Sequence, residues 1–69
     1  EFKRIKDAGG YVEHARVNGN LALSRALGDF EFKKDPDLGA EKQIVTAYPD
    51  VKKHEIKNES TEFLVLACD

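Results

Sequence analysis

The chain has 69 residues, of which 18 are Leu, Ile, Val or Phe, and a formal net charge of −2. This apolar content is typical of a folded domain, but a chain of this size buries only about 60% of the surface that its unfolded form exposes, so we expect marginal stability. Acidic and basic residues are interleaved without a basic stripe, which argues against nucleic-acid binding. Every apolar run is far shorter than the roughly 20 residues that span a bilayer, which argues against a membrane protein.

The first part of the chain predicts a helix followed by a strand or a hairpin. Residues 1–8 (EFKRIKDA) place apolar side chains at helical spacing, and the two glycines that follow are typical of a helix end. Residues 11–17 carry β-forming residues among polar ones, which predicts one strand or the two arms of a hairpin. The dipeptide Asn18-Gly19 predicts a turn, because both residues tolerate positive φ.

The middle of the chain predicts a short helix and a long loop. The helix covers residues 21–27 (LALSRAL), with Asn20 as its cap and Gly28 at its end. Residues 33–43 (KKDPDLGAEKQ) carry both signs of charge, a proline and a glycine, which indicates a surface loop. The loop is about as long as loops become before they suggest function or disorder. Residues 43–47 are a candidate short strand.

The last third of the chain predicts two strands joined by a turn. Residues 51–56 (VKKHEI) alternate weakly and would be at best half buried, and residues 57–61 form a polar turn. Residues 63–68 (FLVLAC) are the longest continuous apolar run. Its length and β-branched content favour a strand covered on both faces. The pattern as a whole predicts a mixed α and β fold whose most buried strand stands last.

The ends and the single cysteine suggest where the chain belongs. The sequence begins without Met, inside a predicted helix, and ends at Asp69 directly after the apolar run. Since domain boundaries normally fall in exposed linkers, we expect residues 1–69 to be an internal piece of one larger domain. The single cysteine, Cys68, excludes an internal disulfide and favours a reducing compartment.

Asp69 is the first candidate site residue. The end of a buried strand is a rigid place for a ligand, and Mg²⁺ and Mn²⁺ prefer carboxylate oxygens. One aspartate cannot hold such an ion alone, so the local sequence favours a turn or a helix cap. Arg25 and Asp29 are the second candidate, because a guanidinium suits carboxylate or phosphate. A pair of Arg25 with Asp29, or a contact of Arg25 with the backbone, that staples the helix end is favoured over substrate binding there.

Three stretches resemble signatures of the type 2C, metal-dependent serine/threonine protein phosphatases. They are GGYVEHARVNGNLALSRALGDFEF at 9–32, QIVTAYPDV at 43–51 and EFLVLACD at 62–69, in the family's order and at similar spacing. The resemblance implies an α+β fold, a four-layer α-β-β-α sandwich with two central antiparallel sheets. Residues 1–69 would form an internal part of that one catalytic domain, incomplete at both ends.

The resemblance also implies an activity and a cofactor. The family hydrolyses phosphoserine and phosphothreonine in phosphorylated proteins, with a water activated by two Mg²⁺ or Mn²⁺ ions. The family's strand that ends in Ala-Cys-Asp carries one metal-binding carboxylate, and its match here is Asp69, which reverses the preference of the local sequence. The family's other metal ligands and its phosphate-binding arginine have no match in these residues. The chain alone is therefore expected to be inactive.

Further expectations follow from the same resemblance. Arg25 and Asp29 would be framework for the active centre, and residues 33–43 would lie near the family's flap, a variable segment that influences substrate choice. The parent protein would be intracellular, in the cytoplasm or nucleus, and its domain monomeric. A relative without catalytic activity that serves as a binding scaffold in signalling is the alternative, and Asp69 favours the enzyme.

Overall fold

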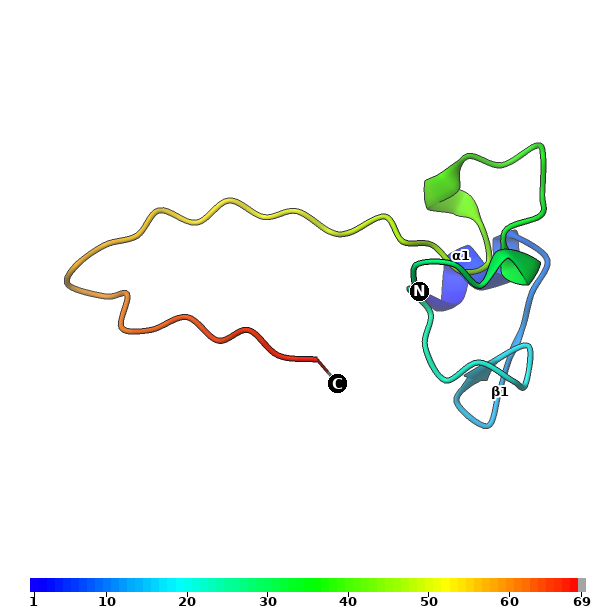
Figure 1. The fold of residues 1–69 in the computed structure, drawn as a ribbon, viewed down its shortest axis with the longest axis horizontal. Helices are drawn as coiled ribbons and strands as arrows, with labels where there is room; N and C mark the ends of the chain where they lie inside the picture. Colours follow the sequence, from blue (N-terminus) through cyan, green and yellow to red (C-terminus); the bar gives the residue numbers. More distant parts are fainter. Residues whose placement is uncertain (69) are drawn as a thin grey trace.

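The computed structural model describes residues 1–68, in which the helices and strands are few and short. In chain order they are α1 (Phe2–Asp7), β1 (Val12–Glu13), β2 (Arg16–Val17), and the 3-10 helices η1 (Phe30–Phe32) and η2 (Ala40–Lys42). These elements gather at one end of a molecule that measures 46 × 27 × 21 Å, and the rest of the chain extends away from them (Figure 1). None of the helices within residues 1–68 has the length and apolar character needed to cross a membrane.

Helix α1 confirms the helix predicted at the start of the chain, including its end. The amide of Gly9 donates to the carbonyl of Lys6 (3.0 Å) and that of Gly10 to Ile5 (2.9 Å), which is the Schellman pattern of helix termination. Gly9 has a φ of +89°, a value that glycine adopts without a Cβ penalty. Ile5 is buried, whereas Phe2 is exposed, so the inner face of α1 is narrow.

The predicted hairpin is confirmed and consists of β1 and β2, which pair antiparallel with Val12 opposite Val17. Its two turn residues, His14 and Ala15, have φ values of 52° and 59°. Positive φ at both central positions is the requirement of a type I′ turn, which Asn and Gly usually fill. The sequence gives no such signal at these two positions, and the pairing of the flanking strands sets the turn.

The turn predicted at Asn18-Gly19 is confirmed, but it follows β2 and does not join the two strands. It brings the carbonyl of Leu21 back to the amide of Val17 (2.7 Å). The amide of Asn18 donates to the carbonyl of Tyr11 (2.7 Å), and its side-chain oxygen accepts the Tyr11 amide (3.0 Å). Asn18 therefore extends the hairpin by one more pair.

The helix predicted over residues 21–27 is wrong. Beyond the bridge at Leu21, this segment contains bends and no helical turn. Its backbone instead finds distant partners: Arg4 donates to the carbonyl of Ser24 (2.8 Å), and the amide of Ala26 donates to the carbonyl of Thr46 (3.2 Å). Contacts with segments far along the chain override a weak helical propensity here.

A small core lies where these segments meet. Its buried apolar residues are Ile5, Val17, Phe32 and Val45. The strand predicted over residues 43–47 does not form a ladder, so that prediction is wrong, although its residues supply the fully enclosed Val45. The sheet of the described residues has two strands. The elements between residues 1 and 68 thus form a much smaller assembly than a four-layer sandwich.

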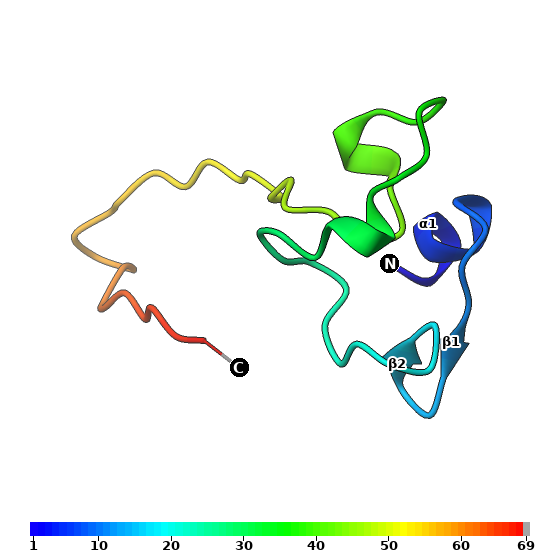
Figure 2. The same cartoon turned by 45° about the vertical axis from the view of Figure 1, so that its right-hand side comes forward.

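Residues 51–68 form two extended segments joined by a turn, which run out from the core and back (Figures 1 and 2). The predicted turn over residues 57–61 is confirmed, since the amide of Thr61 donates to the carbonyl of Lys57 (2.8 Å). The strands predicted over 51–56 and 63–68 are wrong for this structure, because neither segment joins a sheet within the described residues.

The apolar run at residues 63–68 is exposed, contrary to the prediction of a strand covered on both faces. Leu64 is 81% exposed and Leu66 is 83% exposed. A strand buried on both faces needs neighbouring strands and two covering layers, and the elements of residues 1–50 are occupied with the core around Val45. The apolar run therefore has the composition of a buried strand, but the described residues do not cover it.

Candidate functional site

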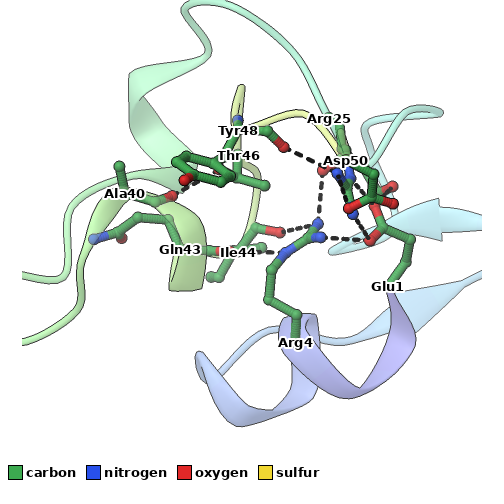
Figure 3. A network of polar contacts seen from close by, with 10 residues as sticks. Glu1, Arg4, Arg25, Ala40, Gln43, Ile44, Thr46, Tyr48 and Asp50 are labelled. Atoms are coloured by element: carbon green, nitrogen blue, oxygen red, sulfur yellow. Dashed lines mark hydrogen bonds and ion pairs between the residues drawn. The ribbon is translucent and has the colours of Figure 1, made fainter. Parts of the chain in front are cut away.

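Glu1, directly before α1, is the centre of a polar network that joins three parts of the chain (Figure 3). Its Oε1 accepts hydrogen bonds from Ser24 Oγ (2.6 Å) and Arg25 Nε (2.9 Å). Its Oε2 accepts from Arg25 Nη2 (2.8 Å) and Arg4 Nη1 (2.6 Å). Arg25 thus holds the carboxylate with two parallel bonds, the geometry in which a guanidinium is most selective.

Arg4 projects from α1 into the protein and binds backbone carbonyls. Its Nη2 donates to the carbonyls of Ser24 (2.8 Å) and Ile44 (3.3 Å), and its Nε donates to that of Gln43 (3.2 Å). The Arg4 side chain is only 12% exposed, so these bonds satisfy donors that water cannot reach freely. Arg4 therefore fastens α1 to two segments that lie about 20 and 40 residues further along the chain.

Arg25 fastens the base of the extended segments. Its Nη1 donates to the carbonyl of Tyr48 (2.9 Å) and to Asp50 Oδ1 (3.2 Å), while its other nitrogens hold Glu1. The five donors of one planar guanidinium allow it to serve a carbonyl and two carboxylates together. The position at which residues 51–68 leave the core is consequently tied to α1.

The network changes the acidity of its members. The bonds from Arg25 hold the pKa of the Glu1 carboxyl far below its usual range, and Ser24 and Arg4 lower it further. Burial opposes them and is the second-largest influence after Arg25. Glu1, and to a lesser extent Asp50, raises the pKa of Arg25. Both groups are therefore charged at every pH at which the protein would work.

The network borders a hollow of about 360 Å³ between α1 and the loop that carries η2. Charges of both signs line it, and several are already paired, as Lys3 is with Asp7. Arg4 and Arg25 direct their donors to protein oxygens, so these arginines order the chain and are not arranged to bind an anion. The described polar residues around this hollow therefore serve to hold segments of the chain together.

The carbonyl and carboxylate contacts expected of Arg25 are present, but the partners differ from the expected ones. Arg25 binds Glu1, Asp50 and the Tyr48 carbonyl, and it does not staple a helix end. Asp29 instead directly precedes η1 with a φ of 49°, and its carbonyl accepts the amide of Phe32 (3.0 Å). The pairing of Arg25 with Asp29, which the sequence analysis considered, is wrong.

Asp69, the predicted metal ligand, lies outside the described residues. Within residues 1–68, no group of three or more His, Cys, Asp or Glu side chains is placed to hold a metal ion. Mg²⁺ and Mn²⁺ require several converging oxygen ligands. The described residues by themselves therefore do not fit a metal centre.

Glu1 and Arg4 were not predicted as members of a site. Their spacing of three residues places them on one face of a helix, which is the only local signal. The partners of Arg4 are mostly backbone carbonyls of distant segments. Such partners carry no side-chain signature, so the sequence could not reveal them.

A protein-family model and several known proteins match this chain over its full length. The family model described as Protein phosphatase 2C matches residues 1–69. A Protein phosphatase 2C homolog 2 from Aspergillus fumigatus is 67% identical over 69 residues, which are 100% of this chain and 16% of the relative. The homolog 2 from Saccharomyces cerevisiae is 59% identical over 69 residues, covering 100% of this chain and 15% of the relative.

Solved structures also match this chain, and we describe one that is similar in both sequence and fold. It is the crystal structure of a phosphatase from a pathogenic strain of Toxoplasma gondii, with 55% sequence identity and a TM-score of 0.66. The match covers 70% of this chain and 15% of that one. The chain thus spans about a sixth of the length of the curated relatives it matches.

The Glu1 carboxylate is expected to stabilise the fold fully above its ordinary pKa, and progressively less as the pH falls toward its much lower pKa in the folded protein. For the experiments we define a host chimera, in which residues 1–69 replace the matching segment of the Saccharomyces cerevisiae relative. Glu1→Gln should lower its free energy of unfolding at pH 7 by about 1 kcal/mol, a modest value because solvent screens the carboxylate, which is 40% exposed.

Because folding lowers the pKa of Glu1, its contribution is complete above the unfolded value near 4.5 and is lost as the pH falls below that value. Urea unfolding at pH 7 and pH 3 should therefore show a difference between the two proteins that shrinks at pH 3. A difference that stays constant or grows on acidification would refute the proposed role of the charge. Glu41→Gln is the matched control, since Glu41 is exposed and does not contact either arginine of the network.

Proposed function

The chain belongs to the protein phosphatase 2C family, and we propose that it forms part of a metal-dependent serine/threonine protein phosphatase. The observation that carries this proposal is the match of the family model over all 69 residues, together with identities of 59% to 67% to named phosphatase homologs. Because the chain spans only about a sixth of those relatives, the activity belongs to the complete domain.

In this proposal, residues 1–69 are an internal part of one four-layer α-β-β-α sandwich. The exposed apolar run at 63–68 supports it, since consecutive exposed apolar side chains require partners for burial. The fold similarity to the Toxoplasma gondii phosphatase, with a TM-score of 0.66, supports it as well. In the complete domain, the two extended segments of residues 51–68 would become paired strands.

Asp69 is the residue that we propose as a metal ligand of the complete domain, with Mg²⁺ or Mn²⁺ as the ion. When bound, such ions would lower the pKa of a coordinated water and so supply hydroxide as the nucleophile for phosphorus. The support for Asp69 is the resemblance of EFLVLACD to the family's signature, and the other ligands would come from residues outside this chain, because residues 1–68 hold no suitable cluster. In the complete domain, this chain would contribute the strand that holds this one carboxylate in place.

The substrates in this proposal are intracellular proteins that carry phosphoserine or phosphothreonine, in the cytoplasm or nucleus. A monomeric complete domain is proposed as well. The loop at residues 33–43, which matches the neighbourhood of the family's flap, would lie beside the active centre. Its exposed charges of both signs give it the polar surface that a phosphorylated polypeptide would meet.

The host chimera tests the proposed function directly. With Mn²⁺ it should hydrolyse a phosphothreonine peptide within about tenfold of the rate of the unmodified relative, since most of its framework would be preserved. The 69-residue chain assayed alone should show no turnover. A folded chimera that binds Mn²⁺ but has lost hydrolysis would favour a segment from a non-catalytic scaffold and overturn the proposal.

A further inference from the structure

The segment from Lys33 to Thr46 is a loop whose two ends lie together. The amide of Val45 donates to the carbonyl of Phe32 (3.5 Å), next to the start of the loop. Lys33 Nζ donates to the carbonyl of Ala26 (2.7 Å) and fixes that start. Loops of this length with adjoining ends are packed by their own side chains and are frequently functional.

Gln43 fills the interior of this loop and satisfies its backbone. Its Nε2 donates to the carbonyls of Asp35 and Leu38, both at 2.8 Å, and its Oε1 accepts the amide of Asp35 (3.2 Å). The Gln43 side chain is buried and uses both donors and one acceptor in these bonds. The hydrogen bonds of this one side chain therefore hold the loop backbone in place, since the loop has no strand pairing of its own.

Thr46 makes a second fastening on the other side of η2. Its Oγ1 donates to the carbonyl of Ala40 (2.7 Å) and accepts the amide of Tyr48 (3.1 Å). Asp35 adds a local turn by accepting the amide of Asp37 (2.9 Å). Between these bonds the loop exposes Lys34, Glu41 and Lys42 to solvent. The backbone is fixed from within, while its charged side chains remain free to meet a partner.

We propose that Gln43 is a positioning residue, which holds the loop at residues 34–42 in a preformed shape to receive the polypeptide around a phosphorylated residue. This inference rests on the proposed phosphatase function. The hollow of about 360 Å³ between the loop and α1 is lined by Leu38, Glu41 and Lys42 from the loop. An apolar side chain with charges of both signs suits a polypeptide better than a simple anion.

A loop that is already ordered does not lose conformational freedom on binding, so its affinity for the polypeptide is higher than that of a loosely held loop. Loss of the Gln43 bonds should weaken the binding of a substrate that contacts the loop. It should affect much less the turnover of a bound substrate, because the hydrogen bonds of the Gln43 side chain within the described residues go only to the loop backbone. Loss of the Gln43 bonds should therefore raise KM and leave kcat nearly unchanged.

The test compares two neighbouring substitutions in the host chimera. Gln43→Glu keeps the shape of the side chain but removes both donors and places negative charge against two carbonyl oxygens, so each carbonyl is left unsatisfied. Val45→Ala is the matched control, because it weakens the core next to the loop and leaves all the Gln43 bonds in place. The two variants should be compared at temperatures at which both are folded.

For Gln43→Glu, we expect the KM for a phosphothreonine peptide to rise about tenfold, with kcat within about threefold of the parent value. Hydrolysis of p-nitrophenyl phosphate, which has no polypeptide, should change much less. The amide of Asp35 should exchange with deuterium at least about tenfold faster than in the parent, because repulsion between the new carboxylate and the two carbonyls pushes the accepting oxygen away from it. Val45→Ala should show neither the rise in KM nor the local acceleration.

Three outcomes would overturn the inference: unchanged exchange at Asp35, equal losses on the peptide and on p-nitrophenyl phosphate, or the same KM change in Val45→Ala. If the parent chimera hydrolyses neither substrate, the proposed function fails. The exchange at Asp35 then still decides whether Gln43 holds the loop, so the two failures are distinguishable.

Discussion

Replacing Asp69 by Asn in the host chimera is expected to lower kcat/KM for a phosphothreonine peptide by about 100-fold or more. Asn keeps the size of the side chain but removes the negative charge that a hard divalent cation prefers. Substitutions in the layer outside the ligands already cost about 10- to 100-fold in metal affinity or activity, so loss of a ligand should cost at least the upper value. Initial rates at low peptide concentration across a Mn²⁺ series measure both kcat/KM and the Mn²⁺ concentration at half-maximal rate.

The matched control for this prediction is Asp7→Asn. Asp7 is an exposed aspartate on α1 whose only ion pair is with Lys3 in the described residues. This variant should keep its rate and its Mn²⁺ midpoint within about twofold, since exposed ion pairs contribute little. If Asp69→Asn matches it in both rate and Mn²⁺ midpoint, Asp69 is not a ligand and the proposed site is wrong.

Local signals in the sequence predicted the parts of the fold that local contacts determine. The end of α1 follows from the glycines at positions 9 and 10, because a residue in the left-handed region terminates a helix wherever it stands. The turns at Asn18-Gly19 and at residues 57–61 likewise depend on bonds between residues within four positions of each other. At such helix ends and turns, the residues that form the sequence pattern also make the contacts that fix the structure.

Predictions failed where distant partners decide the structure. Residues 21–27 have a helical composition, but the Ser24 carbonyl is bound by Arg4 and the Ala26 amide by the Thr46 carbonyl, so a helix does not form. Residues 63–68 show the opposite case: their apolar pattern requires partners that residues 1–50 do not offer. Local propensity is a weak determinant in both segments, and tertiary contacts or their absence prevail.

The candidate site residues also differ in whether the sequence could predict them. Asp69 was found through resemblance to a family signature, and it remains a prediction because it lies outside the described residues. The Arg4 and Arg25 network is apparent only in three dimensions, since it connects Glu1, the segment at 24–25 and the segment at 43–50. A framework that joins segments through backbone carbonyls leaves little trace in residue types.

Phe32→Ala should be among the most destabilising substitutions in the host chimera, lowering its free energy of unfolding by about 3 kcal/mol. Phe32 is 6% exposed and packs in η1 against the core that contains Ile5 and Val45. Truncation of a buried aromatic side chain removes its transfer free energy and leaves a cavity, which together cost about 3–5 kcal/mol. Urea unfolding monitored by circular dichroism measures the loss.

Phe30→Ala is the matched control, because it makes the same substitution two residues earlier in η1 on a side chain that is 76% exposed. The Nζ of Lys33 lies 5.9 Å from the Phe30 ring centroid, a contact of at most about 1 kcal/mol at an exposed site. The Phe30 variant should therefore lose no more than about 1 kcal/mol. Equal losses at the two positions would mean that the core around Val45 is not the one that the complete domain uses, whereas a large loss at Phe32 alone would place this core within the folded domain.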